Sequence, residues 1–219
     1  MNDGIILIDK PAGMTSFGVV ARVRRVLSER AGKKVKVGHT GTLDPFATGL
    51  MILVTGKECK NAATYTKLDK VYEATFILGK KSTTGDPEGD ITSVSNIVPS
   101  EDDMKKVLAQ FTGEIHQRPP IFSAIKINGQ RAYKLARSGE EVEIPERTVT
   151  VYSLNLLEYT HPEVKVRTHV SSGTYIRSLA VDIGEALGTG AYCNQLRRTA
   201  ISDWRVEAAQ TLGDLGITN

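Results

Sequence analysis

The sequence predicts an α+β protein with a largely antiparallel mixed sheet and flanking helices. Strand-like and helix-like patterns follow one another in irregular order, without the regular strand–helix alternation of a parallel α/β fold. The chain has 219 residues, of which 40% are hydrophobic and 24% are charged, so it is long and apolar enough to bury a substantial core. We expect one domain that spans residues 1–219.

The first third of the chain supplies three elements. Residues 4–8 have the pattern of a short buried strand, and Thr15 or Ser16 can then cap a helix because their hydroxyls accept a hydrogen bond from the first turn. The helix has an apolar stripe of Val19, Val20, Val23, Val26 and Leu27. Residues 50–54 are apolar throughout, which indicates a buried segment that is too short to be assigned as strand or helix by periodicity.

The middle of the chain reads as a strand, a loop and a helix. Residues 71–78 alternate, with Tyr72, Ala74, Phe76 and Leu78 on one face, which predicts a half-buried strand. Residues 83–90 form a polar loop. Ser100 and Asp103 then give the N-terminal capping pattern of a helix. The apolar positions of that helix are Met104, Val107, Leu108 and Phe111.

The remaining elements follow a charged segment. Residues 118–147 are expected to contain a protruding insertion, with a short helix around residues 133–138. Strands are expected at residues 149–157 and 164–170. Thr174 can cap a last long helix, and Gly188 would close it.

Composition limits the classes of function. Cys59 and Cys193 lie far apart without the spacing of a disulfide framework or a zinc site, which points to a reducing compartment. The four histidines are scattered at His39, His116, His161 and His169. We therefore expect no metal and no cofactor.

The chain shows no signal for membranes and an ambiguous one for nucleic acid. Residues 1–4 lack a basic start, and no apolar run is long enough to span a bilayer, so we expect a cytoplasmic protein. The net charge of +3 is too small to indicate a nucleic-acid partner by itself. The cations cluster at Arg22, Arg24, Arg25, Arg30, Lys33, Lys34 and Lys36. This run is either a solvated helix face or a track for RNA.

The segment from Gly38 to Gly49, GHTGTLDPFATG, is the most informative stretch. It places one carboxylate, Asp44, in a glycine-rich loop between two apolar runs. Its glycines permit positive φ angles or the close approach of a ligand, and Pro45 biases Asp44 toward an extended backbone. Local chemistry alone leaves a plain tight turn as the alternative.

This segment resembles the GHxGTLDPxATG signature of the TruB family of tRNA pseudouridine synthases, which isomerise a uridine in the T loop (position 55) of transfer RNA. Other segments resemble the family in the same order along the chain: Gly4–Pro11 with Gly13 and Thr15–Ser16, Val71–Glu73 with Leu78–Gly79, Ser123–Lys126, Gly173–Arg177 and Leu196–Arg198. The resemblance covers essentially the whole chain. It implies the pseudouridine synthase fold, with a central active-site cleft, and a helix that begins near Pro45.

The resemblance also implies roles for particular residues. Asp44 would be the catalytic carboxylate, as a nucleophile or as a base, and Arg177 would be the charged partner that keeps its pKa low. An extruded uridine needs an aromatic surface to stack on, and Tyr72 matches the stacking tyrosine of the family. Tyr175 and Leu196 match positions that line the uracil pocket. Taken alone, Arg177 would be a solvated arginine on a helix, and Tyr72 would be a core tyrosine. Tyr175 and Leu196 alone would be packing residues.

Three further residues are assigned through the same resemblance. His39 matches the family histidine that holds the T loop open by filling the space of flipped bases. Lys10 would support the active-site floor, and Lys126 would reach RNA or the pocket backbone. Lys10 could equally be a surface cation.

The chain departs from the family pattern at its end. Most bacterial members continue into a small RNA-binding domain of the PUA type, and this chain stops soon after residues 206–215. We expect that C-terminal PUA domain to be absent and binding of tRNA to be weakened. We also expect a monomer. Two other functions compete with this one. A tRNA-binding folding factor would need no chemistry, and Asp44, Tyr72 and Arg177 argue against a purely binding role without excluding both activities in one protein. A nucleoside hydrolase would need a positioned water and usually paired carboxylates or a metal cluster, and the sequence shows neither.

Overall fold

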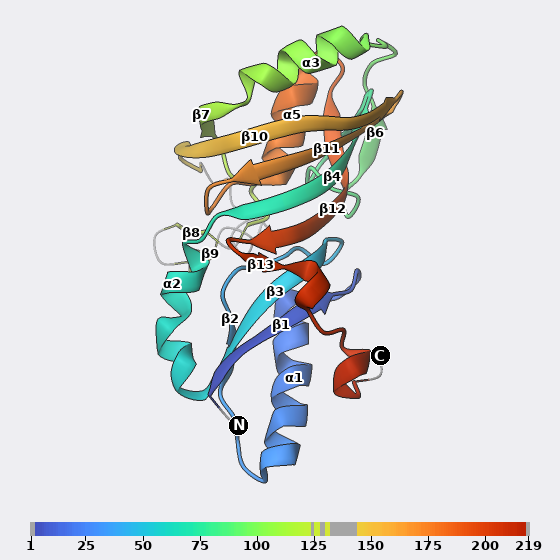
Figure 1. Cartoon of the computed structure of the whole chain (residues 1–219). Coiled ribbons are helices and arrows are strands. Elements are labelled where there is room, and N and C mark those ends of the chain that lie inside the picture. The colour runs from blue at the N-terminus through green and yellow to red at the C-terminus, as the bar shows by residue number, and fades with distance from the viewer. Residues whose placement is uncertain (1–2, 124, 128–129, 132–143, 218–219) are drawn as a thin grey trace. The chain divides into compact units, whose positions relative to one another are not determined.

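The computed structural model describes residues 3–123, 125–127, 130–131 and 144–217, and the chain forms two compact units. The first unit comprises residues 1–73 and 196–219, and the second comprises residues 74–195. The chain passes from one unit to the other within strands β4 (Lys70–Leu78) and β12 (Ala191–Ile201). Each unit combines strands with helices, which confirms the predicted α+β class (Figure 1).

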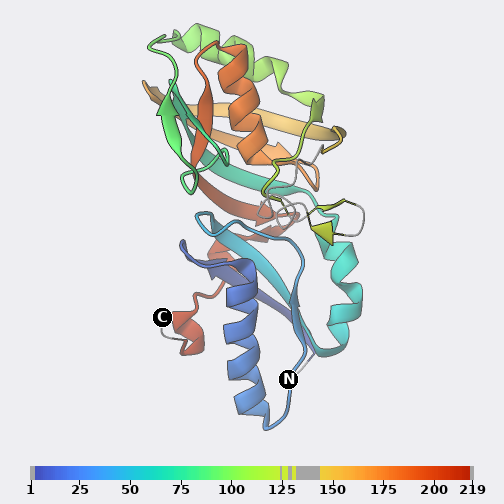
Figure 2. The same ribbon diagram turned by 180° about the vertical axis from the view of Figure 1, so that it is seen from behind.

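The first unit is built on a mixed sheet around β3 (Thr48–Thr55). Strands β1 (Gly4–Lys10) and β2 (Val37–His39) pair with β3 in antiparallel orientation, and β12 pairs with it in parallel. Every residue of β3 after its first is buried, as expected of a strand covered on both faces. Helix α1 (Ser16–Ala31) packs over one face of this sheet (Figure 2).

Helix α1 begins as its sequence predicts. The hydroxyl of Thr15 accepts a hydrogen bond from the Gly18 amide, so Thr15 is the N-cap. Gly32 ends the helix with a left-handed φ of 63°. Val19, Val20 and Val23 are buried, whereas the last two members of the predicted stripe are only half-buried.

The remaining elements of the first unit are short. A 3-10 turn (Gly56–Asn61) leads into α2 (Ala62–Thr66). Strand β13 (Trp204–Arg205) pairs with β12, and two 3-10 turns follow at Val206–Ala208 and Gly213–Leu215. A core cluster of Leu50, Ile52, Ile201 and Val206 joins the sheet to this C-terminal segment.

The helix expected near Pro45 from the family resemblance is not present. Residues 41–47 form turns and loop, and β3 begins directly at Thr48. The Pro45 carbonyl, which would accept a hydrogen bond in the first turn of such a helix, is bonded elsewhere. It accepts from the Gly13 amide and from Lys10 Nζ.

The second unit contains a sheet in which β4, β11 (Glu163–Val170), β10 (Arg147–Thr160) and β7 (Gly113–Gln117) follow in that spatial order. Strand β10 is antiparallel to both of its neighbours, which fits the predicted antiparallel character. Helix α5 (Ile176–Ala186) lies over one face of this sheet (Figure 2).

Smaller elements complete the second unit. Strands β5 (Lys80–Ser82) and β6 (Ile91–Ser93) pair with each other around the loop of residues 83–90. Helix α3 (Glu101–Gln110) carries the predicted capping box of Ser100 and Asp103. Strands β8 (Lys126–Ile127) and β9 (Gln130–Arg131) form a short hairpin. The helix expected at residues 133–138 lies outside the described residues.

Two local predictions for the second unit were wrong. Tyr175, and not Thr174, is the N-cap of α5, because the Thr174 hydroxyl donates to the Ser171 carbonyl (3.0 Å). The half-buried alternation of β4 also fails after Glu73: Thr75 and Ile77 are buried as well as Phe76. The end of this strand is therefore covered on both faces.

Candidate active site

The loop that carries Asp44 connects β2 to β3 in the first unit. The Ala47 amide donates to the Asp44 carbonyl (3.2 Å), which closes a tight turn, and Asp44 itself is half-buried. Of the glycines at 38, 41 and 49, Gly49 alone has a positive φ, 105°. The flexibility of glycine is therefore used at the end of the loop, where it enters β3.

Two buried side chains hold the loop on either side of Asp44. The Ser16 hydroxyl accepts from the Leu43 amide (2.8 Å) and donates to the Leu43 carbonyl (2.9 Å). The fully buried Lys10 donates from Nζ to the Pro45 carbonyl (3.1 Å) and to the Pro11 carbonyl (2.8 Å). The backbone is thus anchored immediately before and after Asp44. The position from which the Asp44 side chain extends is therefore fixed.

Other predicted site residues of the first unit lie on its strands. Tyr72 on β4 and Leu196 on β12 are both buried, with 7% and 8% of their surface exposed. The Thr199 hydroxyl of β12 donates to the Val71 carbonyl of β4 (3.3 Å), next to Tyr72. His39 is half-buried on β2, opposite Leu53 of β3.

Lys70 is a buried cation on the same face of β4 as Tyr72. Its Nζ donates to the carbonyl groups of Thr66 and Leu68, at the end of α2. Burial, followed by repulsion from Arg198, lowers the pKa of Lys70 to about 8. Proton loss from Lys70 therefore begins close to neutral pH.

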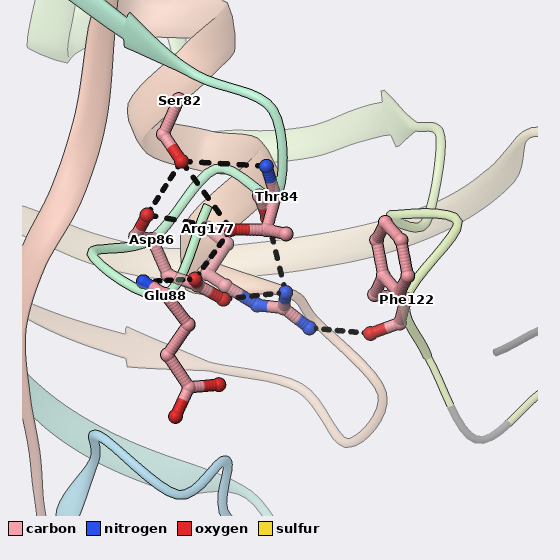
Figure 3. Close-up of polar contacts among 6 residues, drawn as sticks. All are labelled: Ser82, Thr84, Asp86, Glu88, Phe122 and Arg177. Atoms are coloured by element: carbon pink, nitrogen blue, oxygen red, sulfur yellow. Dashed lines mark hydrogen bonds and ion pairs between the residues drawn. The ribbon is translucent and has the colours of Figure 1, made fainter. Parts of the chain in front are cut away.

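Arg177 lies in the second unit, on the first turn of α5, where it is only 3% exposed. Figure 3 shows its guanidinium in a cage of oxygen atoms. Nη1 donates to Asp86 Oδ2 (2.8 Å) and to the Thr84 carbonyl (3.0 Å), and Nη2 donates to the Phe122 carbonyl (2.8 Å). A buried guanidinium held in this way has a fixed orientation.

Asp86, which pairs with Arg177, was not selected from the sequence. Its side chain is 2% exposed, and Oδ1 accepts from the Glu88 amide (3.0 Å) and the Thr84 hydroxyl (Figure 3). The sequence pattern predicts residues 83–90 only as a polar loop. The signal was present, because Gly85-Asp86-Pro87 repeats the Asp-Pro pattern, with neighbouring glycine, that drew attention to Asp44.

Tyr175 is held by the end of β7. Its amide donates to Gln117 Oε1 (2.7 Å), and its carbonyl accepts from Gln117 Nε2 (2.9 Å). The Arg147 guanidinium lies over the Tyr175 ring, 4.8 Å from the ring centroid. This cation–π contact fixes the ring, and Arg147 is a second residue that sequence reasoning did not select.

A cavity of about 310 Å³ adjoins Arg177 within the second unit. Its walls come from residues 82–85, residues 118–122 and α5. Asp182 lines it, and burial, followed by repulsion from Glu185 and Glu146, raises the pKa of Asp182 to about 6. Apolar side chains form much of the remaining wall, including Ile121, Phe122 and Val181.

The last predicted residue, Lys126, belongs to β8, and its side chain is not among those described. Among the described residues, no three His, Cys, Asp or Glu side chains lie together as a metal site requires. Among the same residues, no helix combines the length and the apolar character needed to cross a membrane.

Comparison with known proteins defines the class. A family model described as "TruB family pseudouridylate synthase (N terminal domain)" matches residues 24–176. A second, described as "tRNA pseudouridylate synthase B C-terminal domain", matches residues 177–217. The chain therefore belongs to the TruB family of pseudouridylate synthases, an enzyme family of isomerases.

Curated relatives agree with this assignment. The chain is 44% identical over 210 residues to tRNA pseudouridine synthase B of Azoarcus sp. (strain BH72), which covers 96% of this chain and 68% of the relative. It is 44% identical over 213 residues to tRNA pseudouridine synthase B of Burkholderia mallei (strain NCTC 10247), covering 97% of this chain and 69% of the relative.

Solved structures confirm the predicted pseudouridine synthase fold. The Cbf5 chain of a Cbf5-Nop10-Gar1 complex matches with a TM-score of 0.74 and 35% identity over 96% of this chain. An H/ACA RNP bound to a substrate RNA that contains 2'-deoxyuridine matches with a TM-score of 0.70 and 33% identity, also over 96%. The chain spans about half the length of these structures, 53% and 51%.

Proposed function

We propose that this protein is a tRNA pseudouridine synthase that isomerises the T-loop uridine, position 55, to pseudouridine. The observation that supports this most directly is the anchoring of the Asp44 loop in a chain of the TruB family. Leu43 and Pro45 are both bonded to buried side chains, so the carboxylate between them starts from a fixed backbone. Pre-organisation of this kind is what a catalytic carboxylate needs.

The reaction breaks the bond between ribose C1' and uracil N1, turns the base, and joins C1' to C5. The C5 proton leaves and N1 gains one, so the product is an isomer of the substrate and no electron is transferred. Asp44 serves this reaction as a nucleophile or as the base that removes a sugar proton. Cleavage and rejoining at one carbon explain why a single well-placed carboxylate suffices.

Arg177 is proposed as the charged partner of Asp44. A carboxylate in a site closed to water needs such a partner, because burial alone favours its protonation. The guanidinium is held by Asp86 and by two carbonyl groups within its own unit. Such a fixed cation can hold a second carboxylate without reorganising.

The remaining residues would bind the extruded base and the RNA. Tyr72 is proposed to stack on the uracil, and Tyr175 and Leu196 to line its pocket. His39 would occupy the space that flipped bases leave in the T loop. Lys10 acts behind the catalytic loop, and Lys126 is proposed to reach RNA.

The proposed partner is the T-stem-loop of tRNA, bound by a cytoplasmic monomer. The basic run from Arg22 to Lys36 lies on α1 and on the segment that leads into β2 and the Asp44 loop. Cations along that path would neutralise phosphates of the RNA arm, so binding should weaken as the salt concentration rises.

Release of tritium from C5-labelled uridine in a T-stem-loop transcript tests the proposal. We expect wild-type protein to release the label from the T-loop uridine, and no label when cytidine replaces uridine at position 55. Release that is unchanged by this replacement would contradict the assigned position. Accelerated refolding of tRNA without release of tritium would instead identify an RNA folding factor.

A further inference from the structure

Arg198 is a buried cation on β12 whose hydrogen bonds reach both ends of the Asp44 loop. It is 1% exposed, and Nε donates to the Leu50 carbonyl at 2.7 Å. Nη2 donates to the Gly41 carbonyl at 3.2 Å. These two carbonyl groups lie before and after Asp44 in the sequence, so one rigid guanidinium sets the distance between the ends of the loop.

The backbone of Arg198 meets the loop as well. Arg198 is paired with Gly49 in the parallel register between β12 and β3. A Cβ atom built on Gly49 would lie 2.3 Å from the Arg198 carbonyl oxygen and 2.7 Å from its nitrogen. Only glycine permits this approach, and it brings the end of the loop directly against Arg198.

Packing alone does not explain why a charged side chain is buried at position 198. A guanidinium removed from water loses much of its solvation, and an apolar side chain of similar size would fill the same volume without that cost. The charge of Arg198 also repels the ammonium group of Lys70, and this repulsion contributes to the lowered pKa of Lys70. The directed donors of Arg198 are what an apolar residue could not supply.

The strand of Arg198 also carries or contacts other candidate site residues of the first unit. Leu196 lies two positions earlier, on the same face of β12, because side chains alternate along a strand. Thr199, one position later, donates to the carbonyl next to Tyr72. A shift of β12 relative to the loop would therefore move Asp44 relative to these residues.

We infer that Arg198 is a positioning residue for Asp44, which ties the catalytic loop to the strand that bears Leu196. This inference rests on the proposed function. It assigns Arg198 no contact with RNA or with the reacting atoms. Loss of the Arg198 hydrogen bonds should therefore lower the rate of the chemical step and leave RNA affinity nearly unchanged.

The test compares Arg198→Lys and Arg198→Met with wild type in single-turnover assays on a T-stem-loop RNA. Lysine keeps the charge but cannot donate to both carbonyl groups in the fixed geometry of guanidinium. We expect the single-turnover rate to fall about 10- to 100-fold, as for a displacement of roughly 1 Å, with a change in Kd of less than about threefold. Methionine should lower the rate at least as far.

Arg197→Lys is the matched control on the same strand. Arg197 binds Asp9 of β1 through both carboxylate oxygens, at 3.0 and 2.7 Å, and Nη1 also donates weakly to the Thr48 hydroxyl at 3.4 Å. The substitution weakens an anchor of the same strand without touching Gly41 or Leu50. We expect a lower thermal midpoint and a single-turnover rate within about threefold of wild type.

Three results would overturn the inference. They are a wild-type rate in folded Arg198→Lys, a loss of RNA affinity equal to the loss of rate, and failure of both Arg198 variants to fold, which would make the residue a folding determinant. Asp44→Asn is assayed in parallel. If it keeps its activity, the proposed function fails; if it is inactive while Arg198→Lys is normal, only the role of Arg198 fails.

Discussion

Arg177 and Asp86 form a buried ion pair, with Nη1 2.8 Å from Oδ2 and only 3% and 2% of the two side chains exposed. The two residues are 91 positions apart in the sequence. The pair connects the loop between β5 and β6 to the first turn of α5. It fixes the cation that we propose as the partner of Asp44.

Replacement of Asp86 should therefore be costly. In Asp86→Asn the Arg177 charge stays buried without its carboxylate, which typically destabilises a protein by about 3–5 kcal/mol. Urea unfolding of the variant measures this loss. Activity should fall as well, because the guanidinium is no longer held in place.

The control for Asp86→Asn is Glu185→Gln. Glu185 pairs with Lys81 at 3.3 Å, but both side chains are about half exposed, so this pair should contribute less than about 1 kcal/mol. Equal losses of stability in the two variants would contradict the account of the buried pair.

Gly49→Ala should destabilise the protein by more than about 2 kcal/mol. The added methyl group would overlap the Arg198 backbone and would impose a φ of 105° on a residue that avoids it. Gly32→Ala is the control, because Gly32 also has a positive φ, 63°, and nothing within 4 Å of an added Cβ. Thermal unfolding should show the larger loss at Gly49, and the opposite order would refute the close approach.

Lys70 makes the stability of the protein depend on pH in the alkaline range. Its pKa is about 8 in the folded protein, against 10.5 for the free group, so the unfolded chain holds more protons between these values. The contribution of Lys70 to the unfolding free energy therefore rises with pH across that window. Lys70→Met should remove this part of the rise. Identical pH profiles of wild type and variant in urea unfolding would show that Lys70 is not shifted.

Asp182 has the opposite effect in the acid range, where it makes the free energy of unfolding fall as the pH rises. Burial raises its pKa to about 6 from 3.8, so the folded protein holds more protons between these values. Its contribution to stability is present below pH 3.8 and is lost as the pH rises through about 6. Asp182→Asn should flatten that loss, which differential scanning calorimetry over the same window can measure. An unaltered profile would contradict the shift.

Local patterns predicted the elements whose formation is local. The Thr15 cap of α1 and the capping box of Ser100 and Asp103 depend on residues within one turn, and both were correct. The alternation that starts at Tyr72 located a strand. The Asp44 loop was selected because its composition is unusual and its resemblance to a family signature is nearly complete.

Long-range contacts explain what the sequence analysis missed. The Arg177–Asp86 pair joins residues that no periodicity connects. The absence of a helix at Pro45 depends on bonds from Lys10 and Gly13, which compete for the backbone of the loop. The burial of both faces of β4 likewise depends on which elements cover it, and its own sequence does not determine that.

The most direct test of the central claim is single-turnover formation of pseudouridine in a T-stem-loop RNA by wild type and Asp44→Asn, with RNA affinity measured for both. Loss of a group that acts on the reacting atoms should lower the rate by at least about a thousandfold, while Kd remains within a few fold of wild type. Asp44→Asn that folds, binds the RNA and still forms pseudouridine at the wild-type rate would contradict the account.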